Sequence, residues 1–362
     1  MSSVYRGHKM KNKINAAWFV AMIIVSAVSV FTGCSGRENT QEVQTDESDP
    51  DAGKVKIGIS FDSFVIERWQ QDRDIFVSSA TENGAIVNVQ TANGDAQKQI
   101  QDIDYFIKQK EDVIVIIPVD RSSLGESVEK AHRAGIKVIA YDRLMTDSRP
   151  DLYISFDNSA VGQFMAEVIN SSLPDGGNCI KINGPHEDYN VTLVNEGFDT
   201  TINRNINIID ETECSGWVGE EAFDFLDGHP EEVSKADAIM CGNDSLAGQV
   251  VTLLAERRLA GKVIVTGQDA DLEACQRVVE GTQTMTVYKP IGQLARTAAQ
   301  DAIILAKGGD VPDVETISNG KYDIPYVRIT PQKVTKDSID SVIIDSGFHL
   351  KEDVYMNSKS EN

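Results

Sequence analysis

Short β-branched runs alternate with longer amphipathic stretches along the chain from Lys54 onward. Strands are expected over 55–61, 85–92, 112–119, 137–142, 152–157, 178–184, 205–210, 237–244 and 262–269. Helices are expected over 68–84, 96–110, 123–135, 160–173, 245–259 and 270–281, several of them ending at glycine. This alternation indicates βαβ units, so the predicted fold class is α/β with mostly parallel strands, in one wide sheet or two smaller ones.

Polar and charged residues recur where the predicted strands end. Ligands of parallel α/β sheets bind beyond the carboxyl ends of the strands, so these side chains are candidate site residues. Asp and Asn can instead cap the helix that follows, which is the alternative at each position. Arg143 is not a capping residue, so the pair Asp142–Arg143 is the stronger indication of a site. The set comprises Asp62, Asp120, Asp142, Arg143, Asp157, Asn158, Asn183, Asn243, Asp244, Gln268 and Asp269.

The first 33 residues differ in character from the rest of the chain. Basic residues precede the apolar run "INAAWFVAMIIVSAVSVF", which ends at "TGC" with Cys34. This pattern is typical of a bacterial lipoprotein signal peptide, after whose removal the cysteine carries the lipid. An uncleaved membrane anchor is the alternative, and Met10 is an alternative start. Residues 34–53 are polar and acidic without apolar periodicity, and they are expected to form a tether.

The charge of the chain narrows the possible partners. Its formal net charge is −22, which argues against nucleic acid as a partner. The cysteines beyond Cys34 form no CxxC pair, and we expect them to be buried small apolar residues rather than disulfide partners. They are Cys179, Cys214, Cys241 and Cys275.

The motifs of common enzyme classes are missing from the chain. It contains no GxGxxG, P-loop, HExxH or GxSxG motif, and its five histidines are scattered. No enzyme activity, cofactor or metal is therefore expected. The strand ends instead supply carboxylates, guanidinium groups and amides, which together can accept from and donate to sugar hydroxyls. Trp69 and Trp217 offer aromatic faces for the C–H groups of a pyranose ring, although packing is the alternative for a tryptophan in a loop.

Several ordered motifs carry a resemblance to a known family. They are "ERWQQDRDIF", "IIPVD", "GIKVIAYDR", "YISFDN", "GKVIVTGQDADL" and "GTQTMTVYKPI", and they span the chain from about Lys54 to "SGFH". Together they resemble the type I periplasmic sugar-binding proteins of ABC importers, on the branch that binds D-xylose. The resemblance implies two Rossmann-like lobes with parallel sheets, joined by a three-segment hinge and closing on a sugar.

The resemblance also implies where the chain crosses between lobes. Crossings are expected near Asp157, Tyr288 and Tyr322. The N-terminal sugar-binding lobe would then comprise 54–157 plus 288–322, and the C-terminal lobe 158–287 plus 323–350. Residues 351–362 would form a tail.

Nine residues match sugar-contacting positions of the family. One motif, "GPHEDYN", departs from the family pattern, since Tyr189 follows Asp188 where the family has an amide. Within "RWQQDRD", the side chains of Gln71, Asp72, Arg73 and Asp74 are expected to be solvated. The nine predicted sugar-binding residues are Arg68, Trp69, Asp142, Arg143, Asn190, Trp217, Asn243, Asp269 and Lys289.

The resulting functional hypothesis is an exported monomer that is anchored to the outer face of the cytoplasmic membrane by lipidated Cys34. It would capture D-xylose or a related monosaccharide and deliver it to an ABC permease. One alternative is a receptor for another pentose or hexose. Another is a sensory component that presents sugar to a membrane histidine kinase.

Overall fold

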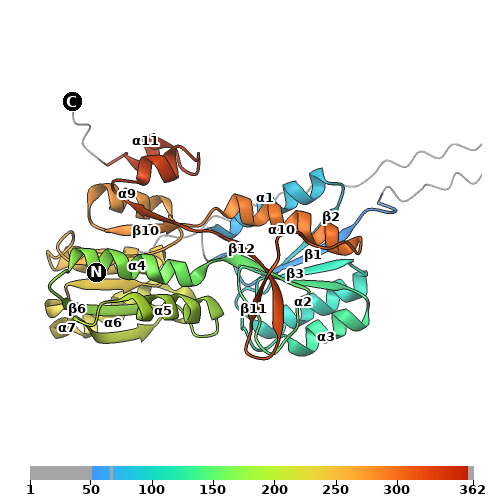
Figure 1. The fold of residues 1–362 in the computed structure, drawn as a ribbon, viewed down its shortest axis with the longest axis horizontal. Coiled ribbons are helices and arrows are strands. Elements are labelled where there is room, and N and C mark those ends of the chain that lie inside the picture. The colour runs from blue at the N-terminus through green and yellow to red at the C-terminus, as the bar shows by residue number, and fades with distance from the viewer. Residues whose placement is uncertain (1–50, 66–67, 358–362) are drawn as a thin grey trace, which may run out of the picture. The chain divides into compact units, whose positions relative to one another are not determined.

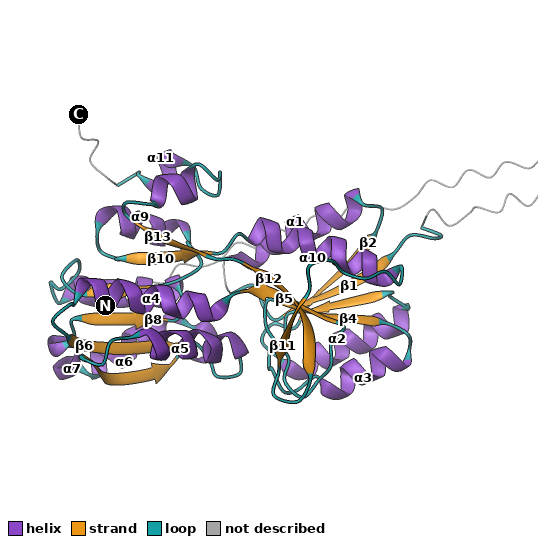
Figure 2. Ribbon diagram, in the orientation of Figure 1, coloured by secondary structure: helices purple, strands orange, loops and turns teal. Residues whose placement is uncertain are grey.

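A computed structural model describes residues 51–65 and 68–357. The predicted signal peptide, Cys34 and nearly all of the predicted tether lie outside these residues. The described chain contains two sheets, each the centre of one lobe (Figures 1 and 2). All nine predicted strands are present, so the α/β fold class is confirmed.

The first lobe, called the N-lobe, is built on a seven-stranded sheet of order β11-β12-β5-β4-β3-β1-β2. All of its strand pairs are parallel except β11 with β12. Its strands are β1 (Lys56–Phe61), β2 (Ile86–Thr91), β3 (Val113–Ile116), β4 (Lys137–Tyr141), β5 (Leu152–Phe156), β11 (Glu315–Ser318) and β12 (Asp323–Ile329). Its helices are α1 (Arg68–Glu82), α2 (Ala96–Gln109), α3 (Gly125–Arg133) and α10 (Ile291–Ala306).

The second lobe, called the C-lobe, is built on a six-stranded sheet of order β13-β10-β9-β8-β6-β7. Its strands are β6 (Gly177–Asn183), β7 (Ile206–Glu213), β8 (Ala238–Cys241), β9 (Ile264–Thr266), β10 (Met285–Tyr288) and β13 (Gln332–Thr335). Its helices are α4 (Asn158–Ser172), α5 (Tyr189–Thr201), α6 (Gly219–Gly228), α7 (Pro230–Lys235), α8 (Asp244–Glu256), α9 (Leu272–Glu280) and α11 (Lys351–Val354). Short helical turns occur at Ser215–Trp217 and Asp340–Ile344.

Both faces of the central strands of each sheet are buried, which explains why these strands are nearly continuously apolar. In β3, Val113 and Val115 pack toward α1 and α10, whereas Ile114 and Ile116 pack toward α2 and α3. Figure 1 shows these helix pairs on opposite faces of the N-lobe sheet. A strand covered on both faces needs apolar side chains at every position, because its successive side chains point in opposite directions.

Two of the three predicted crossings agree with the strand pairings, and one does not. The chain leaves the N-lobe sheet after β5 and returns to that lobe after β10, near the predicted Asp157 and Tyr288. The third crossing is not near Tyr322, because β12 pairs in parallel with β5 in the N-lobe. The chain leaves the N-lobe only after Ile329, and β13 then pairs with β10. Residues 323–329 therefore belong to the N-lobe rather than to the C-lobe.

The segment predicted as a tail is partly structured. Residues 351–354 form α11, and the side chain of Val354 is buried in a cluster with residues of α9 and with Ile343. The four described cysteines are buried, as expected for small apolar residues. Among residues 51–65 and 68–357, no helix has the length and apolarity that crossing a membrane would require.

Asp301 of α10 is a carboxyl group buried inside the N-lobe. Its Oδ2 has no hydrogen-bond partner within the described part of the chain. Burial raises the pKa of Asp301 from 3.8 to about 6. Because the neutral form is favoured in the folded state, the stability that this group contributes is lost as the pH rises through about 6.

We therefore expect Asp301→Asn to stabilise the protein at pH 8 and only about half as much at pH 5, where the wild-type carboxyl is largely protonated in the folded state. The melting temperature at pH 8 should rise by about 2 °C or more, since 1 kcal/mol moves the midpoint of a large domain by roughly 2–4 °C. Differential scanning calorimetry of both proteins from pH 5 to pH 8 measures this. An equal difference at both pH values would contradict the role of ionisation.

Candidate functional site

One cavity between the two lobes collects all nine predicted site residues. The space between atoms in the cavity and at its mouth, open solvent included, is about 310 Å³. Most of its lining residues lie at or just beyond the carboxyl ends of strands from both sheets, where parallel α/β sheets bind ligands. The lining residues are Arg68, Trp69, Asp142, Arg143, Asp188, Asn190, Trp217, Asn243, Gln268, Asp269 and Lys289.

Arg68 holds two carboxylates on the N-lobe side of the cavity. Its Nε lies 3.1 Å from Asp72 Oδ2, and its Nη2 lies 2.8 Å from Asp142 Oδ2. The guanidinium also lies over the ring of Trp69, 4.4 Å from the ring centroid. Burial alone would raise the pKa of Asp142, but Arg68, Lys289 and Arg143 outweigh it, so the pKa of Asp142 is lowered. Asp142 is therefore a charged acceptor in the cavity wall.

Asp72 is buried, which corrects the prediction that it is solvated. It lies one helical turn after Arg68 on α1, and it accepts hydrogen bonds from Arg68 and from the hydroxyl of Tyr141. The neighbouring Gln71 and Asp74 are exposed, as predicted. A charged run at the start of a helix therefore contains one inward-facing carboxylate, whose partner Arg68 lies four residues earlier, the usual spacing for an ion pair within a helix.

Arg143 joins the two lobes. Its Nη1 lies 2.7 Å from Asp62 Oδ2 in the N-lobe, and its Nε lies 2.7 Å from Asp188 Oδ2 in the C-lobe. Burial alone would lower the pKa of Arg143, but the carboxylates of Asp188 and Asp62 raise it, so the guanidinium stays charged. Asp188 also accepts from the backbone N–H of Asn190 and so caps α5.

Further hydrogen bonds cross between the lobes. Asn190 Nδ2 donates to the backbone oxygen and to Oδ1 of Asp142, at 3.2 and 3.1 Å. Arg121 of the N-lobe donates from its backbone N–H to the Glu187 oxygen and from its side chain to Thr192 Oγ1. Tyr189, the residue that departs from the family motif, packs against the N-lobe core cluster around Phe106. The described structure is therefore closed around the cavity.

The C-lobe side contributes a further ion pair. Lys289 Nζ lies 3.3 Å from Asp269 Oδ1, and both side chains are buried. Asp269 and Ala270 have positive φ angles of 103° and 57°, which are unusual for residues other than glycine. The strained turn is held in place because the Asp269 N–H donates to the Val287 oxygen and the Ala270 N–H donates to Thr286 Oγ1. Strain of this kind is often found at binding sites.

Asp244 supports the same turn from behind the cavity. It accepts hydrogen bonds from Thr286 Oγ1, Gln283 Nε2 and the Asp271 N–H, at 2.6, 2.7 and 3.2 Å. Its neighbour Asn243, which lines the cavity, caps α8 by accepting from the Leu246 N–H. Of the two residues that follow β8, Asn243 thus lines the cavity, and Asp244 supports the Asp269 turn.

The two tryptophans lie on opposite lobes and are both buried. The indole of Trp217 packs directly on Gly184, where an added Cβ would lie 2.3 Å from the ring, so a side chain there would displace the indole. Four residues of the cavity wall carry buried polar atoms without a hydrogen-bond partner among the described residues. These atoms are Trp69 Nε1, Trp217 Nε1, Arg143 Nη2 and Gln268 Oε1. A closed cavity with such atoms in its lining residues suits a ligand with many hydroxyl groups.

Asp188 and Gln268 are not among the nine predicted sugar-binding residues. Gln268 belonged to the strand-end set, but no chemistry distinguished it from a residue that caps a helix. Asp188 stands in the motif that departs from the family, where only Asn190 matched a contact position.

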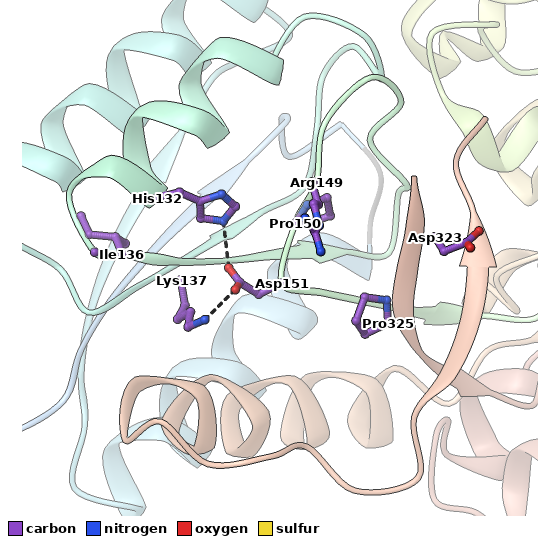
Figure 3. A pocket seen from close by; sticks show the side chains of 9 residues that line it. His132, Ile136, Lys137, Arg149, Pro150, Asp151, Asp323 and Pro325 are labelled. Carbon is purple, nitrogen blue, oxygen red and sulfur yellow. Dashed lines mark hydrogen bonds and ion pairs between the residues drawn. The ribbon is translucent and has the colours of Figure 1, made fainter. Parts of the chain in front are cut away.

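A wider surface pocket lies at the amino ends of β4, β5 and β12, away from this cavity (Figure 3). Its central carboxylate, Asp151, is already paired with His132 Nε2 at 2.9 Å and with Lys137 Nζ at 2.8 Å. Ligands of parallel sheets bind at the other end of the strands. The pocket is therefore not the candidate site. Within the described ranges, no cluster of three histidine, cysteine or carboxylate side chains is placed to hold a metal ion.

Comparison with known proteins gives a consistent result. Residues 57–310 match the model of the family described as "Periplasmic binding protein domain". The chain is 39% identical to the D-xylose-binding periplasmic protein of Escherichia coli K12 over 309 residues, which cover 84% of this chain and 93% of that protein. It is also 39% identical to the D-xylose-binding periplasmic protein of Haemophilus influenzae, over 83% of this chain and 92% of that protein.

A solved structure shares the fold. It is the ABC transporter solute-binding protein of Clostridium phytofermentans with bound β-D-glucose, with a TM-score of 0.74 and 26% identity, and the match covers 83% of this chain and 99% of that one. A multiple sugar-binding periplasmic receptor of Rhizobium radiobacter is 27% identical over 82% of this chain and 92% of that protein.

Proposed function

Because the chain belongs to the periplasmic binding protein domain family, whose members here are solute receptors and not enzymes, we propose that it captures D-xylose between its lobes and delivers it to an ABC importer. The observation that carries the choice of sugar is the 39% identity to two D-xylose-binding proteins over most of each chain. Lipid attachment at Cys34 is part of the proposal and rests on the sequence pattern alone. Labelled palmitate that enters the wild-type protein but not Cys34→Ala tests the anchor.

The cavity suits a small polyol in its chemistry. Asp142 and Asp269 can accept from sugar hydroxyls, and Arg68, Arg143 and Lys289 can donate to hydroxyl and ring oxygens. Each of these charges is paired within the wall, as burial requires. Trp69 and Trp217 can cover the apolar faces of a pyranose from opposite lobes. In the proposal, Asn190 and Asn243 complete the hydrogen bonds.

Isothermal titration of the purified protein with xylose, ribose, arabinose, glucose and galactose tests this assignment. We expect xylose to bind most tightly, with the hexoses weaker, since one additional methylene-sized group in a closed pocket changes the binding free energy by about 1–3 kcal/mol. Absent heat for xylose beside a strong signal for another sugar would contradict the choice of sugar and leave the receptor class intact. Comparable affinities across the panel would instead favour a multiple-sugar receptor.

A further inference from the structure

Gln268 occupies a distinct position in the cavity wall. It follows β9, stands next to Asp269, and is almost fully buried. It lines the cavity between the lobes and, like Trp217, also a smaller cavity in the C-lobe, which is bordered by Asn195 and Met240. Gln268 therefore borders both the candidate sugar site and the interior of the C-lobe.

The orientation of the Gln268 amide is fixed by one hydrogen bond. Its Nε2 donates to the backbone oxygen of Gly242, which identifies the nitrogen end of the amide. The other end, Oε1, is buried and has no hydrogen-bond partner in residues 51–65 and 68–357. A buried carbonyl oxygen without a donor is unfavourable, and an amide oxygen can only accept. The occupant that satisfies it must be an O–H or N–H donor.

We infer that Gln268 Oε1 accepts a hydrogen bond from one hydroxyl of the bound sugar and so selects sugars that carry this hydroxyl. This inference rests on the proposed function. Asp142 and Asp269 are charged acceptors engaged in ion pairs, whereas Gln268 is a neutral acceptor with a preset direction. A site built to pair with a substrate hydroxyl strongly disfavours the analogue that lacks it, because the buried acceptor is then left unpaired.

The smaller cavity offers a competing explanation that can be tested. Asn195 Oδ1 also has no partner in the described chain, while its Nδ2 donates to Asn183 Oδ1. A group with two donors, such as water, could satisfy Asn195 and Gln268 together without any sugar. Asn195 does not line the cavity between the lobes, so Asn195→Leu is a matched control that removes the same kind of carbonyl from the other side.

The experiment measures D-xylose affinity by isothermal titration for wild type, Gln268→Leu, Gln268→Met and Asn195→Leu. We expect both Gln268 variants to lose about tenfold in affinity, as for one neutral hydrogen bond, and the Asn195 variant to stay within about threefold of wild type. Two substitutions at Gln268 guard against a single variant that fails to fold. Near-wild-type affinity in the folded Gln268 variants would overturn the inference, as would equal losses at Gln268 and Asn195.

Monodeoxy analogues of D-xylose identify the hydroxyl. In wild type, removal of each contacting hydroxyl should weaken binding. In the Gln268 variants, one particular deoxy analogue should bind as well as xylose itself, because its missing hydroxyl no longer has a partner to lose. The contrary outcome is that each deoxy analogue binds more weakly than xylose by the same factor in wild type and in the Gln268 variants. Gln268 would then act through the shape of the wall, and the inference fails. Wild type that binds none of the sugars would instead contradict the proposed function.

Discussion

Replacing Asp269 by alanine should lower the affinity for D-xylose by about 100-fold or more and leave the protein folded. The carboxylate is a buried acceptor at the cavity wall, and hydrogen bonds to a charged group contribute about 1.5–3 kcal/mol each. Its removal also leaves Lys289, 3.3 Å away, without its nearest carboxylate. A ligand would then meet an uncompensated ammonium group where it now meets a neutral pair.

Titration calorimetry of Asp269→Ala measures the loss, and thermal unfolding without sugar checks the fold. Glu273→Ala is the matched control, because it removes an acidic charge from the exposed start of α9 four residues away. It should keep the wild-type affinity. Unchanged affinity in Asp269→Ala would refute the placement of the sugar site in this cavity.

Replacing Arg68 by alanine should have the largest effect on stability, about 3–5 kcal/mol in the free energy of unfolding. The substitution leaves the carboxylates of Asp72 and Asp142 buried without the guanidinium that pairs with both. It also removes the cation that lies over the ring of Trp69. Sugar binding should be lost together with stability.

Urea unfolding in the absence of sugar measures this, with the slope of the transition as a check on the extent of unfolding. Arg73→Ala is the control on the same helix, since Arg73 forms a solvent-exposed pair with Asp74. Exposed pairs contribute at most about 1 kcal/mol, so this variant should stay close to wild type. Similar losses of unfolding free energy in both variants would show that the buried network around Arg68 does not stabilise the protein.

Local patterns predicted the fold well because the N-lobe and C-lobe each repeat the same βα unit. The alternation of strands and helices predicted parallel strands, and the polar residues after them marked the carboxyl edge of the sheets, but only the family resemblance implied two separate sheets. The third crossing could not be placed in this way. β12 breaks the βα rhythm, and only its pairing with β5, far away in the sequence, decides that it belongs to the N-lobe.

Sequence motifs predicted the residues whose own side chains line the cavity. They were less informative about features that depend on a residue's partners in the fold. The nine residues taken from the family motifs meet around one cavity, but their role in binding sugar stays a prediction. Asp72 looked like part of a solvated charge run because its burial depends on Tyr141, which is distant in sequence. The sequence shows Gln268 as an amide at the end of a strand. Only its hydrogen bond to the Gly242 oxygen shows that Oε1 is the atom left to accept a hydrogen bond.

The double pairing of Arg143 has a consequence for any opening of the lobes. If the lobes separate, Arg143 parts from Asp188 but keeps Asp62, which belongs to its own lobe. The guanidinium thus retains a counter-charge throughout, and the carboxylate of Asp188 loses its partner only as water reaches the opening cleft. Because Arg143 keeps Asp62, opening the lobes would not leave its guanidinium as an isolated buried charge, which is costly.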